Sequence, residues 1–353
     1  MKSLKILGPE TMVVQDLPVP DPADDEVRVR IHYVGICGSD LNYYFKGANG
    51  PNTVREPFSF GHEMSGVIDE DPSGTYAPGT PVTVAPASPG RPVAGLEAKP
   101  YLWPGSHYMG SAANIPHDQG GASEYVVIKR YMVRVLPESV PLRNGALAEP
   151  LAVALHALAI AGRSSDGIAD RDLLVSGSGP IGLLVAGAAK ILGARSVTSS
   201  DMLAGPLERA RALGVDRTVR LDRESPDDSG YDVVLECSGS PRAVEPAIRA
   251  ARRSGTVCQV GTLPDEDIQV NIAHLETKEI RYVGTFRYDA EIDEAIAMIA
   301  GHPRIATAVT HTFPAERAVE AFATARDSES SGKVLVTMWT DRPPAPSRSR
   351  TTR

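Results

Sequence analysis

The sequence of 353 residues is poor in cysteine and contains no long apolar stretch. Its three cysteines, Cys37, Cys237 and Cys258, are too few and too scattered for a disulfide framework, and they fit a reducing compartment. No window approaches the run of about 20 apolar residues that a bilayer span requires. The N-terminus reaches Gly-Pro and charged residues too early for a signal peptide. We therefore expect a cytoplasmic protein with no membrane partner.

The sequence also lacks an excess of positive charge. Lys and Arg together number 36 against 44 Asp and Glu, which gives a formal net charge of −8. A surface that binds nucleic acid needs a basic patch to displace counterions from the phosphates. We therefore expect no nucleic-acid partner.

The length of the chain exceeds what one hydrophobic core usually organises, so two domains are expected. Residues 1–142 contain short β-like runs separated by Pro and Gly, such as the alternating EVRVRIHYV at residues 26–34. This pattern predicts the first part of a mostly antiparallel β domain.

The pattern changes at residue 143. Strand-like and helix-like segments then alternate as far as residue 280, for example DLLVS at residues 172–176 followed by an apolar helix at residues 180–192. Such alternation predicts an α/β domain with a doubly wound parallel sheet. Residues 281–340 are expected to return to the β domain, and residues 341–353, rich in Pro, Ser and Arg, to form a disordered tail.

A glycine turn joins the predicted strand to the predicted helix. Gly177, Gly179 and Gly182 have G-x-G-x-x-G spacing, with Pro180 and Ile181 between the last two. In this context the first glycine permits a tight turn, the second lets the backbone approach a pyrophosphate, and the third packs the helix on the strand. The free N–H groups of the helix would then face the phosphates. An unrelated glycine-rich loop is the alternative.

An acidic residue, Asp201, ends the next predicted strand. A carboxylate at this place can bind both ribose hydroxyls of NAD and would repel the 2′-phosphate of NADP. Met202 follows it, where an arginine would favour NADP. The sequence therefore favours NAD and leaves NADP open.

Residue types suited to zinc occur at two places in the predicted β domain. Cys37 lies in GICGSD, and His62 is followed by Glu63 in FGHEMSG. A catalytic zinc needs about three protein ligands and an open position. Taken singly, each residue has a simpler reading, because a lone cysteine is usually a small buried hydrophobe and a His-Glu pair usually lies at the surface.

Several longer strings carry a resemblance that covers residues 1–340. GICGSDLNYY, EPFSFGHEMSGVI, PHDQGGASEYVV, LAEPLAVALHAL and VGTFRY occur in the order found in zinc-dependent medium-chain dehydrogenases. The chain resembles their polyol branch, which includes sorbitol dehydrogenases and L-idonate 5-dehydrogenases. This resemblance implies a Rossmann domain together with a GroES-like catalytic domain.

The resemblance also implies the metal ligands. Cys37 and His62 correspond to zinc ligands, and Glu63 to a direct or exchangeable third ligand. Glu149 lies where many alcohol dehydrogenases have a cysteine ligand. In the polyol branch this glutamate binds zinc directly or through its water, and the choice between Glu63 and Glu149 stays open.

Four further residues receive roles from the resemblance. Ser39 falls at the hydroxyl position that relays the substrate proton, and Tyr43 at a position that lines the substrate pocket. Phe286 and Arg287 fall in the stretch that approaches the nicotinamide end of the cofactor. For Arg287 an ordinary surface salt bridge is the alternative.

The sequence departs from the family at one place. Members commonly hold a second, structural zinc with four closely spaced cysteines, but residues 85–110 contain none. His107 alone cannot build a closed tetrahedral site. We therefore predict one catalytic zinc and no structural zinc, with this lobe either held by packing of its prolines, Trp103 and Tyr101 or left mobile. Because the lobe often contributes to subunit contacts, we favour a homodimer through the edge of the nucleotide sheet over a tetramer.

The expected function is reversible hydride transfer between NAD and a secondary hydroxyl or ketone of a polyol, sugar acid or cyclitol. One alternative is a zinc-free medium-chain reductase acting on enones or quinones, which would not need Cys37 and His62. Another is a non-catalytic nucleotide-binding protein such as a redox-sensing regulator, against which the absence of a basic helix-turn-helix segment argues.

Overall fold

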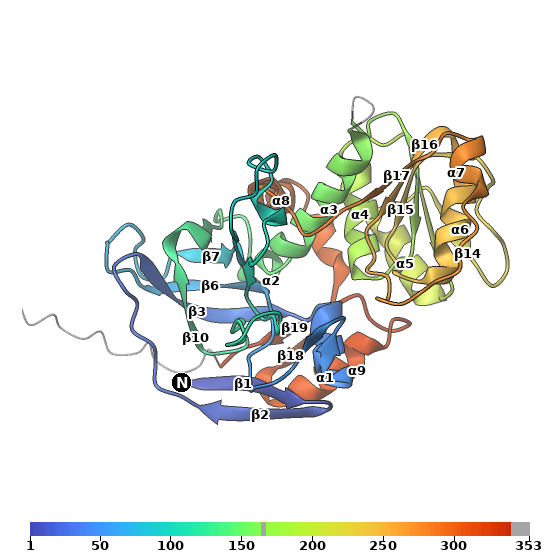
Figure 1. The fold of residues 1–353 in the computed structure, drawn as a ribbon. Coiled ribbons are helices and arrows are strands. Elements are labelled where there is room, and N and C mark those ends of the chain that lie inside the picture. Colours follow the sequence, from blue (N-terminus) through green and yellow to red (C-terminus); the bar gives the residue numbers. More distant parts are fainter. Residues whose placement is uncertain (164–166, 340–353) are drawn as a thin grey trace, which may run out of the picture.

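A computed structural model describes residues 1–163 and 167–339, so the predicted tail at residues 341–353 lies outside the described residues. The chain forms two domains (Figure 1). One is built from both ends of the chain, and the other from its middle. This arrangement agrees with the predicted fold class, an α/β protein with a parallel nucleotide-binding sheet and a mostly β domain.

The middle of the chain forms a six-stranded parallel sheet in the order β14-β13-β12-β15-β16-β17. Alternate residues of its central strand face opposite sides. Leu173 and Val175 pack with helices α3 (Ala148–Gly162) and α4 (Pro180–Ile191), while Leu174 packs with α6 (Pro241–Ala250). Burial on both faces is what a parallel sheet requires. Its elements are β12 (Asp172–Ser176), α4 (Pro180–Ile191), β13 (Ser196–Asp201), α5 (Ala204–Leu213), β14 (Arg217–Arg220), β15 (Tyr231–Glu236), α6 (Pro241–Ala250), β16 (Ala251–Gln259), α7 (Ala273–Thr277) and β17 (Arg281–Gly284).

The other domain contains a seven-stranded sheet in which β11, β7, β6, β3, β19 and β18 are neighbours and β10 also pairs with β3. All pairs are antiparallel except β18 with β19. Its main elements are β1 (Lys2–Gly8), β2 (Thr11–Asp16), β3 (Glu26–Gly35), α1 (Gly38–Lys46), β6 (Glu63–Glu70), β7 (Pro81–Val84), β10 (Tyr125–Lys129), β11 (Val133–Val135), α2 (Leu142–Gly145), β18 (Val309–Pro314), α9 (Ala318–Arg326) and β19 (Lys333–Thr337).

Strand β19 carries the C-terminal part of the chain beside the N-terminal strand β3 (Figure 1). The register places Leu335 opposite Gly35, and on the other side of β3 the same Gly35 lies opposite Glu63 of β6. Residues far apart in the sequence therefore meet at one end of this sheet, which is where the candidate site lies.

The boundary predicted at residue 280 lies one strand too early. Strand β17, at Arg281–Gly284, pairs with β16 and completes the parallel sheet. Helix α8 (Ile292–Gly301) also packs into the core shared with α3 (Ala148–Gly162), through residues such as Ile296. The four residues of β17 are too short to show a clear periodicity, so the sequence pattern did not reveal them.

Within the described part of the chain, no helix has both the length and the apolar character needed to cross a membrane. The nearest in length, α3, has 15 residues.

Candidate metal centre and cofactor cleft

Three potential metal ligands meet where β3, α1 and β6 adjoin. Cys37 caps the N-terminus of α1, His62 immediately precedes β6, and Glu63 is the first residue of that strand. One ligand atom from each lies within 4.8 Å of the others, and among the described residues this is the only such group of three or more. His62 and Glu63 are 7% and 0% exposed. The structure thus brings together three of the four predicted metal ligands.

Glu63 has one oxygen held and one without a partner. Lys333 of β19 forms a buried ion pair with Oε1 at 2.6 Å and also donates to the carbonyl of Ile36 at 3.1 Å. Oε2 is buried and, among the described residues, has no hydrogen-bond partner. A buried carboxylate oxygen left without a partner is costly, so a cation beside Oε2 would satisfy it.

Gly35 makes room for this carboxylate. A Cβ atom at Gly35 would lie 2.1 Å from Oε2 of Glu63, so the carboxylate could not stay where it is if position 35 carried a side chain. The sulfur, imidazole and carboxylate donors form a set that zinc binds in catalytic sites. The residues present therefore fit a single zinc ion.

A fourth acidic residue, Asp40, fixes the loops that carry the ligands. Its buried carboxylate accepts the N–H of Cys37 at 2.9 Å and that of Gly61 at 3.2 Å. Burial raises the pKa of Asp40. Burial by itself would lower the pKa of His62, but the sulfur of Cys37 and the carboxylate of Asp40 raise that pKa well above its usual value. The electrostatic potential at this group is therefore negative, which favours the binding of a cation.

Glu149, in the first turn of α3, lies beside this group but is not a member of it. Its carboxylate is buried, and burial raises its pKa. The hydroxyl of Tyr108 donates a hydrogen bond to Oε1 of Glu149. Burial, together with the negative charge of Glu149, raises the pKa of Tyr108 well above its usual value, so this hydroxyl keeps its proton and acts as a donor.

Arg287 reaches this site from the loop that follows β17. Its guanidinium lies 4.1 Å from the ring centroid of Tyr108 and donates to the hydroxyl of Ser106 at 3.2 Å. Burial lowers the pKa of Arg287. The surface salt bridge considered as the alternative is therefore not what the structure shows for this residue. The contact joins the nucleotide domain to the lobe formed by residues 85–110.

The other predicted residues lie nearby with different surroundings. Ser39 is half-buried in the first turn of α1, two residues after Cys37. Tyr43 is 2% exposed, packs edge-on against Phe58 and accepts the N–H of Ala112 at 3.2 Å. It therefore belongs to the hydrophobic core of the domain. Phe286 is half-exposed beneath the guanidinium of Arg287.

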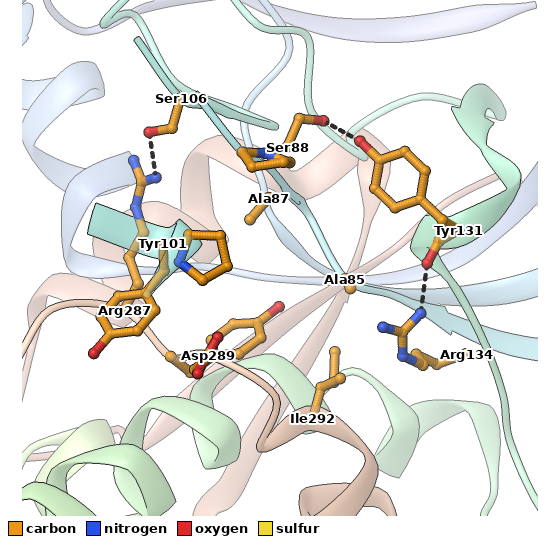
Figure 2. Close-up of a pocket in the computed structure, with 13 residues that line it drawn as sticks. Ala85, Ala87, Ser88, Tyr101, Ser106, Tyr131, Arg134, Arg287, Asp289 and Ile292 are labelled. Atoms are coloured by element: carbon orange, nitrogen blue, oxygen red, sulfur yellow. Dashed lines mark hydrogen bonds between the residues drawn. The ribbon is translucent and has the colours of Figure 1, made fainter. Parts of the chain in front are cut away.

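A cavity of about 150 Å³ lies between the lobe and the loop after β17 (Figure 2). Figure 2 shows Arg287 directed toward Ser106 on one side of it, with Tyr131 bonded to Ser88 and to Arg134 on the other. Residues of both domains line the cavity, and its polar side chains include Ser88, Ser106 and Arg287.

A larger cleft of about 670 Å³ opens at the carboxyl ends of the parallel strands. It is lined by the glycine turn, the end of β13 and the start of α6, including Gly177, Ser200, Asp201, Met202, Ser225, Ser238, Ser240 and Arg242. In open α/β sheets this is where ligands bind, at the point where the strand order reverses. The position and size of the cleft suit the adenosine part of a dinucleotide.

The glycines of the turn have distinct steric roles. Gly177 has a φ of +90°, and a Cβ atom at Gly182 would lie 1.9 Å from the carbonyl oxygen of Gly177. Gly179 precedes Pro180 at the start of α4 and has open space where its side chain would be, while Ile181 is partly buried behind it. Asp201 accepts the N–H of Ser178 at 2.8 Å, so its carboxylate stands at the mouth of the turn.

Sequence patterns did not single out Tyr108, Lys333 or Asp40. Tyr108 is placed by the two-residue pairing of β8 (Ala87–Ser88) with β9 (His107–Tyr108), and Lys333 by the pairing of β19 with β3. Neither contact leaves a local signal. Asp40 had one, since an acidic residue three positions after a helix cap is typical of a capping box.

Comparison with known proteins identifies the family. The model of the alcohol dehydrogenase GroES-like domain matches residues 23–138, and that of zinc-binding dehydrogenases matches residues 180–301. Sorbitol dehydrogenase from Gallus gallus is 34% identical over 347 residues, which cover 94% of this chain and 95% of that protein. The chain belongs to the zinc-binding medium-chain dehydrogenases.

Solved structures agree with this assignment. L-Idonate 5-dehydrogenase from Escherichia coli superposes on this dehydrogenase with a TM-score of 0.89 at 28% identity, covering 95% of this chain and 97% of its own. Galactitol-1-phosphate dehydrogenase from Escherichia coli gives 0.84 at 29% identity, covering 95% and 99%. This dehydrogenase is therefore an enzyme of the polyol and alcohol type, for which zinc and NAD(P) are the typical cofactors, and the predicted family is confirmed.

Proposed function

We propose that this dehydrogenase transfers a hydride between NAD and a secondary hydroxyl or ketone of a polyol, sugar acid or cyclitol. The observation that carries the proposal is the buried group of Cys37, His62 and Glu63, with an unpartnered oxygen of Glu63. A zinc-free reductase or a purely nucleotide-binding protein would have no need to keep such a costly cluster.

The donor set supports a polyhydroxylated substrate. One thiolate, one imidazole and one carboxylate form a harder set than two thiolates and one imidazole, and a harder metal suits chelation by two neighbouring hydroxyl oxygens. The similar proteins are named for sorbitol, L-idonate and galactitol 1-phosphate, which all carry vicinal hydroxyls. Arg287 and Tyr288, which line the cavity of Figure 2, could bind further hydroxyls or a carboxylate.

The residues of the chain divide the work around the reacting carbon. Zinc would supply Lewis-acid activation of the substrate oxygen, and the nicotinamide would accept the hydride. Cys37, His62 and Glu63 would hold the metal. The hydroxyl of Ser39, close to Cys37, would pass the substrate proton outward, and Glu149 would bind the substrate hydroxyl or its water. Tyr43, packed in the core, would shape the pocket wall by supporting α1 and the loop at Ala112.

The cofactor preference follows from the cleft. Gly177, Gly179, Pro180, Ile181 and Gly182 would cradle the pyrophosphate. The carboxylate of Asp201 would bind the ribose hydroxyls and repel a 2′-phosphate. We infer a preference for NAD over NADP, with Phe286 and Arg287 toward the nicotinamide end.

The assembly we infer is a homodimer. Strand β17 is the last strand of the parallel sheet, and Tyr282 within it is 37% exposed. Such an edge offers unpaired backbone groups to a second copy. Mass measured by light scattering would distinguish a dimer from a tetramer or a monomer.

Metal analysis combined with a substrate screen tests the function. We expect one zinc per chain, NADH formation with at least one polyol, sugar acid or cyclitol, and loss of both metal and activity in Cys37→Ala. The mechanism would be wrong if carefully purified, active enzyme contained no zinc. Activity with enones that survives in Cys37→Ala would instead favour the zinc-free reductase.

A further inference from the structure

Two buried glutamates, Glu63 in the metal group and Glu149 beside it, each have one oxygen held by a different residue of the chain. Lys333 holds Oε1 of Glu63, and Tyr108 holds Oε1 of Glu149. Only Glu63 is within 4.8 Å of the donor atoms of both Cys37 and His62 as a member of the candidate metal group. The difference between the two glutamates therefore lies in where their partners hold them.

Tyr108 is itself fixed on both sides. It is 7% exposed, its ring lies edge-on to His62 with centroids 5.3 Å apart, and the guanidinium of Arg287 lies 4.1 Å from its centroid. The backbone pairing of Tyr108 with Ala87 fixes the position of its Cα. The hydroxyl has little freedom to follow Glu149 if that carboxylate were to move.

We propose that Tyr108 is a positioning residue that holds Glu149 away from the metal, so that Cys37, His62 and Glu63 bind it and Glu149 serves the substrate side. The inference rests on the proposed zinc-dependent function. It also decides the choice between Glu63 and Glu149 that the sequence leaves open. On this proposal, the hydrogen bond from the hydroxyl of Tyr108 decides which of the two glutamates binds the metal.

The physical reason lies in the cost of an unsatisfied buried carboxylate. Glu149 is 4% exposed, so without the hydroxyl of Tyr108 its Oε1 would lose a strong hydrogen bond in a region with little water. The nearest compensation is the cation held by the neighbouring group. Removal of the hydroxyl should therefore let Glu149 turn toward the metal and occupy the position meant for substrate.

Cobalt substitution gives a direct readout of metal ligation. We would replace zinc by Co²⁺ in the wild-type enzyme and in Tyr108→Phe, then record the visible spectrum, the rate of metal loss to a chelator, and kcat and KM. We expect an altered cobalt spectrum, metal loss slowed several-fold, and kcat lowered about tenfold or more, which is the range for partners of metal ligands. KM for NAD should change little, because the cleft is elsewhere.

Tyr44→Phe is the matched control. Like Tyr108, Tyr44 is buried (4% exposed), but it lies in the hydrophobic core and its hydroxyl donates to the carbonyl of Glu10 at 3.5 Å, away from the two glutamates. This variant should keep the wild-type spectrum and kcat. A Tyr108→Phe enzyme with the wild-type spectrum and wild-type kcat would overturn the inference.

Glu149→Gln keeps the inference testable if Tyr108→Phe does not fold. Because Glu149 is placed outside the ligand set, Glu149→Gln should retain the wild-type cobalt spectrum. A changed spectrum would identify Glu149 as a ligand and overturn the inference while leaving the zinc-dependent function intact. A wild-type chain that binds neither Zn²⁺ nor Co²⁺ stoichiometrically would refute the proposed function itself.

Discussion

Around the metal group, single atoms decide what each residue can do. Lys333 Nζ takes one oxygen of Glu63, and the missing side chain of Gly35 leaves space for the other. The ion pair is 2% and 1% exposed, and a buried pair of this kind loses several kcal/mol when one partner is removed. Lys333 therefore balances the charge of Glu63 at one oxygen, and the other oxygen is available to bind a metal ion.

Gly35→Ala should abolish tight metal binding. The new Cβ would stand 2.1 Å from Oε2 of Glu63, so the carboxylate must leave the group or β3 must shift. We expect metal affinity to fall at least about tenfold and kcat to fall with it, the range seen when the surroundings of a ligand are disturbed. Competition with a chelator would measure the affinity.

Gly38→Ala is the matched control for Gly35→Ala. Gly38 is the first residue of α1, close to Cys37, and a Cβ atom there meets nothing within 4 Å. The Gly38→Ala enzyme should therefore bind zinc with the affinity of the wild-type enzyme. If both variants lost zinc equally, the loss in Gly35→Ala could not be assigned to the space that Glu63 needs beside Gly35. That result would contradict the prediction.

At the scale of elements, the junction of β12 with α4 combines two separable requirements. Gly182 is needed for helix α4 to approach the turn, because its Cβ would lie 1.9 Å from the carbonyl oxygen of Gly177. Gly179 meets no such limit, since a Cβ there would have nothing within 4 Å. A side chain at Gly179 would stand where the pyrophosphate approaches.

Gly179→Ala and Gly182→Ala should therefore differ in their effect on stability. Gly179→Ala should weaken NAD binding about tenfold with the melting temperature nearly unchanged. Gly182→Ala should weaken NAD binding and also destabilise the fold by about 1–3 kcal/mol, the usual cost of overpacking. Titration with NADH fluorescence and thermal unfolding would measure the two effects. Undiminished NAD affinity in Gly179→Ala would contradict the assigned binding site.

The turn after β6 should contribute less to the stability of the fold at low pH. Burial would raise the pKa of Asp71, but hydrogen bonds from Arg130, Tyr76 N–H and Ser73 outweigh it and lower the pKa to about 2. Because the folded pKa is depressed, the stabilisation is complete above the unfolded pKa and is lost as the pH falls toward 2.

Asp71→Asn should then cost about 2 kcal/mol at neutral pH. The difference from the wild-type enzyme should shrink below about pH 4, where the unfolded carboxylate begins to take up protons. Denaturant midpoints at several pH values would show it. Lys129 and Asp25 form an exposed pair, so Asp25→Asn should leave the stability nearly unchanged. A difference for Asp71→Asn that stays constant down to pH 3 would contradict the assignment.

The elements also show why sequence predicted some features and missed others. The strand at residues 172–176 and the helix after the glycine turn follow from local pattern, and both have nearly the predicted bounds. Strand β17 was missed because four residues carry no clear period. Tyr108 and Lys333 could not be predicted because pairing between distant strands brings them to the site, and that pairing depends on the whole sheet.

On the scale of the whole molecule, hydrogen bonds join the two domains at two places. Arg287 joins the loop after β17 to Ser106 of the lobe, and Arg209 of α5 donates to the carbonyls of Ser328 and Glu329 before β19. These hydrogen bonds join the nucleotide domain to the lobe at residues 85–110 and to the segment before β19. Because residues 85–110 contain no cysteine, we predict that the lobe keeps its shape without a structural zinc.

The chain's own hydrogen bonds close this lobe. Arg91 N–H donates to the carbonyl of Pro104 at 2.9 Å, and the indole N–H of Trp103 to that of Leu96 at 2.9 Å. We predict that chelation removes one zinc per chain and leaves the amide of Arg91 as protected from hydrogen exchange as before. A structural zinc would instead tie the lobe to the metal, and its removal would expose these amides.

Trp103→Ala tests whether the lobe is held by its own hydrogen bonds or by a bound zinc ion. Loss of the indole contact should speed proteolysis within residues 91–104, with the metal content still one zinc per chain by mass spectrometry, since Cys37, His62 and Glu63 are untouched. Wild-type protein with two zincs per chain would contradict the prediction, and so would a lobe that loses protection when the metal is removed. Two zincs per chain would mean that a second site uses fewer than three of these ligand types or ligands from a second copy, because Cys37, His62 and Glu63 form the one group of three or more potential ligands within the described residues.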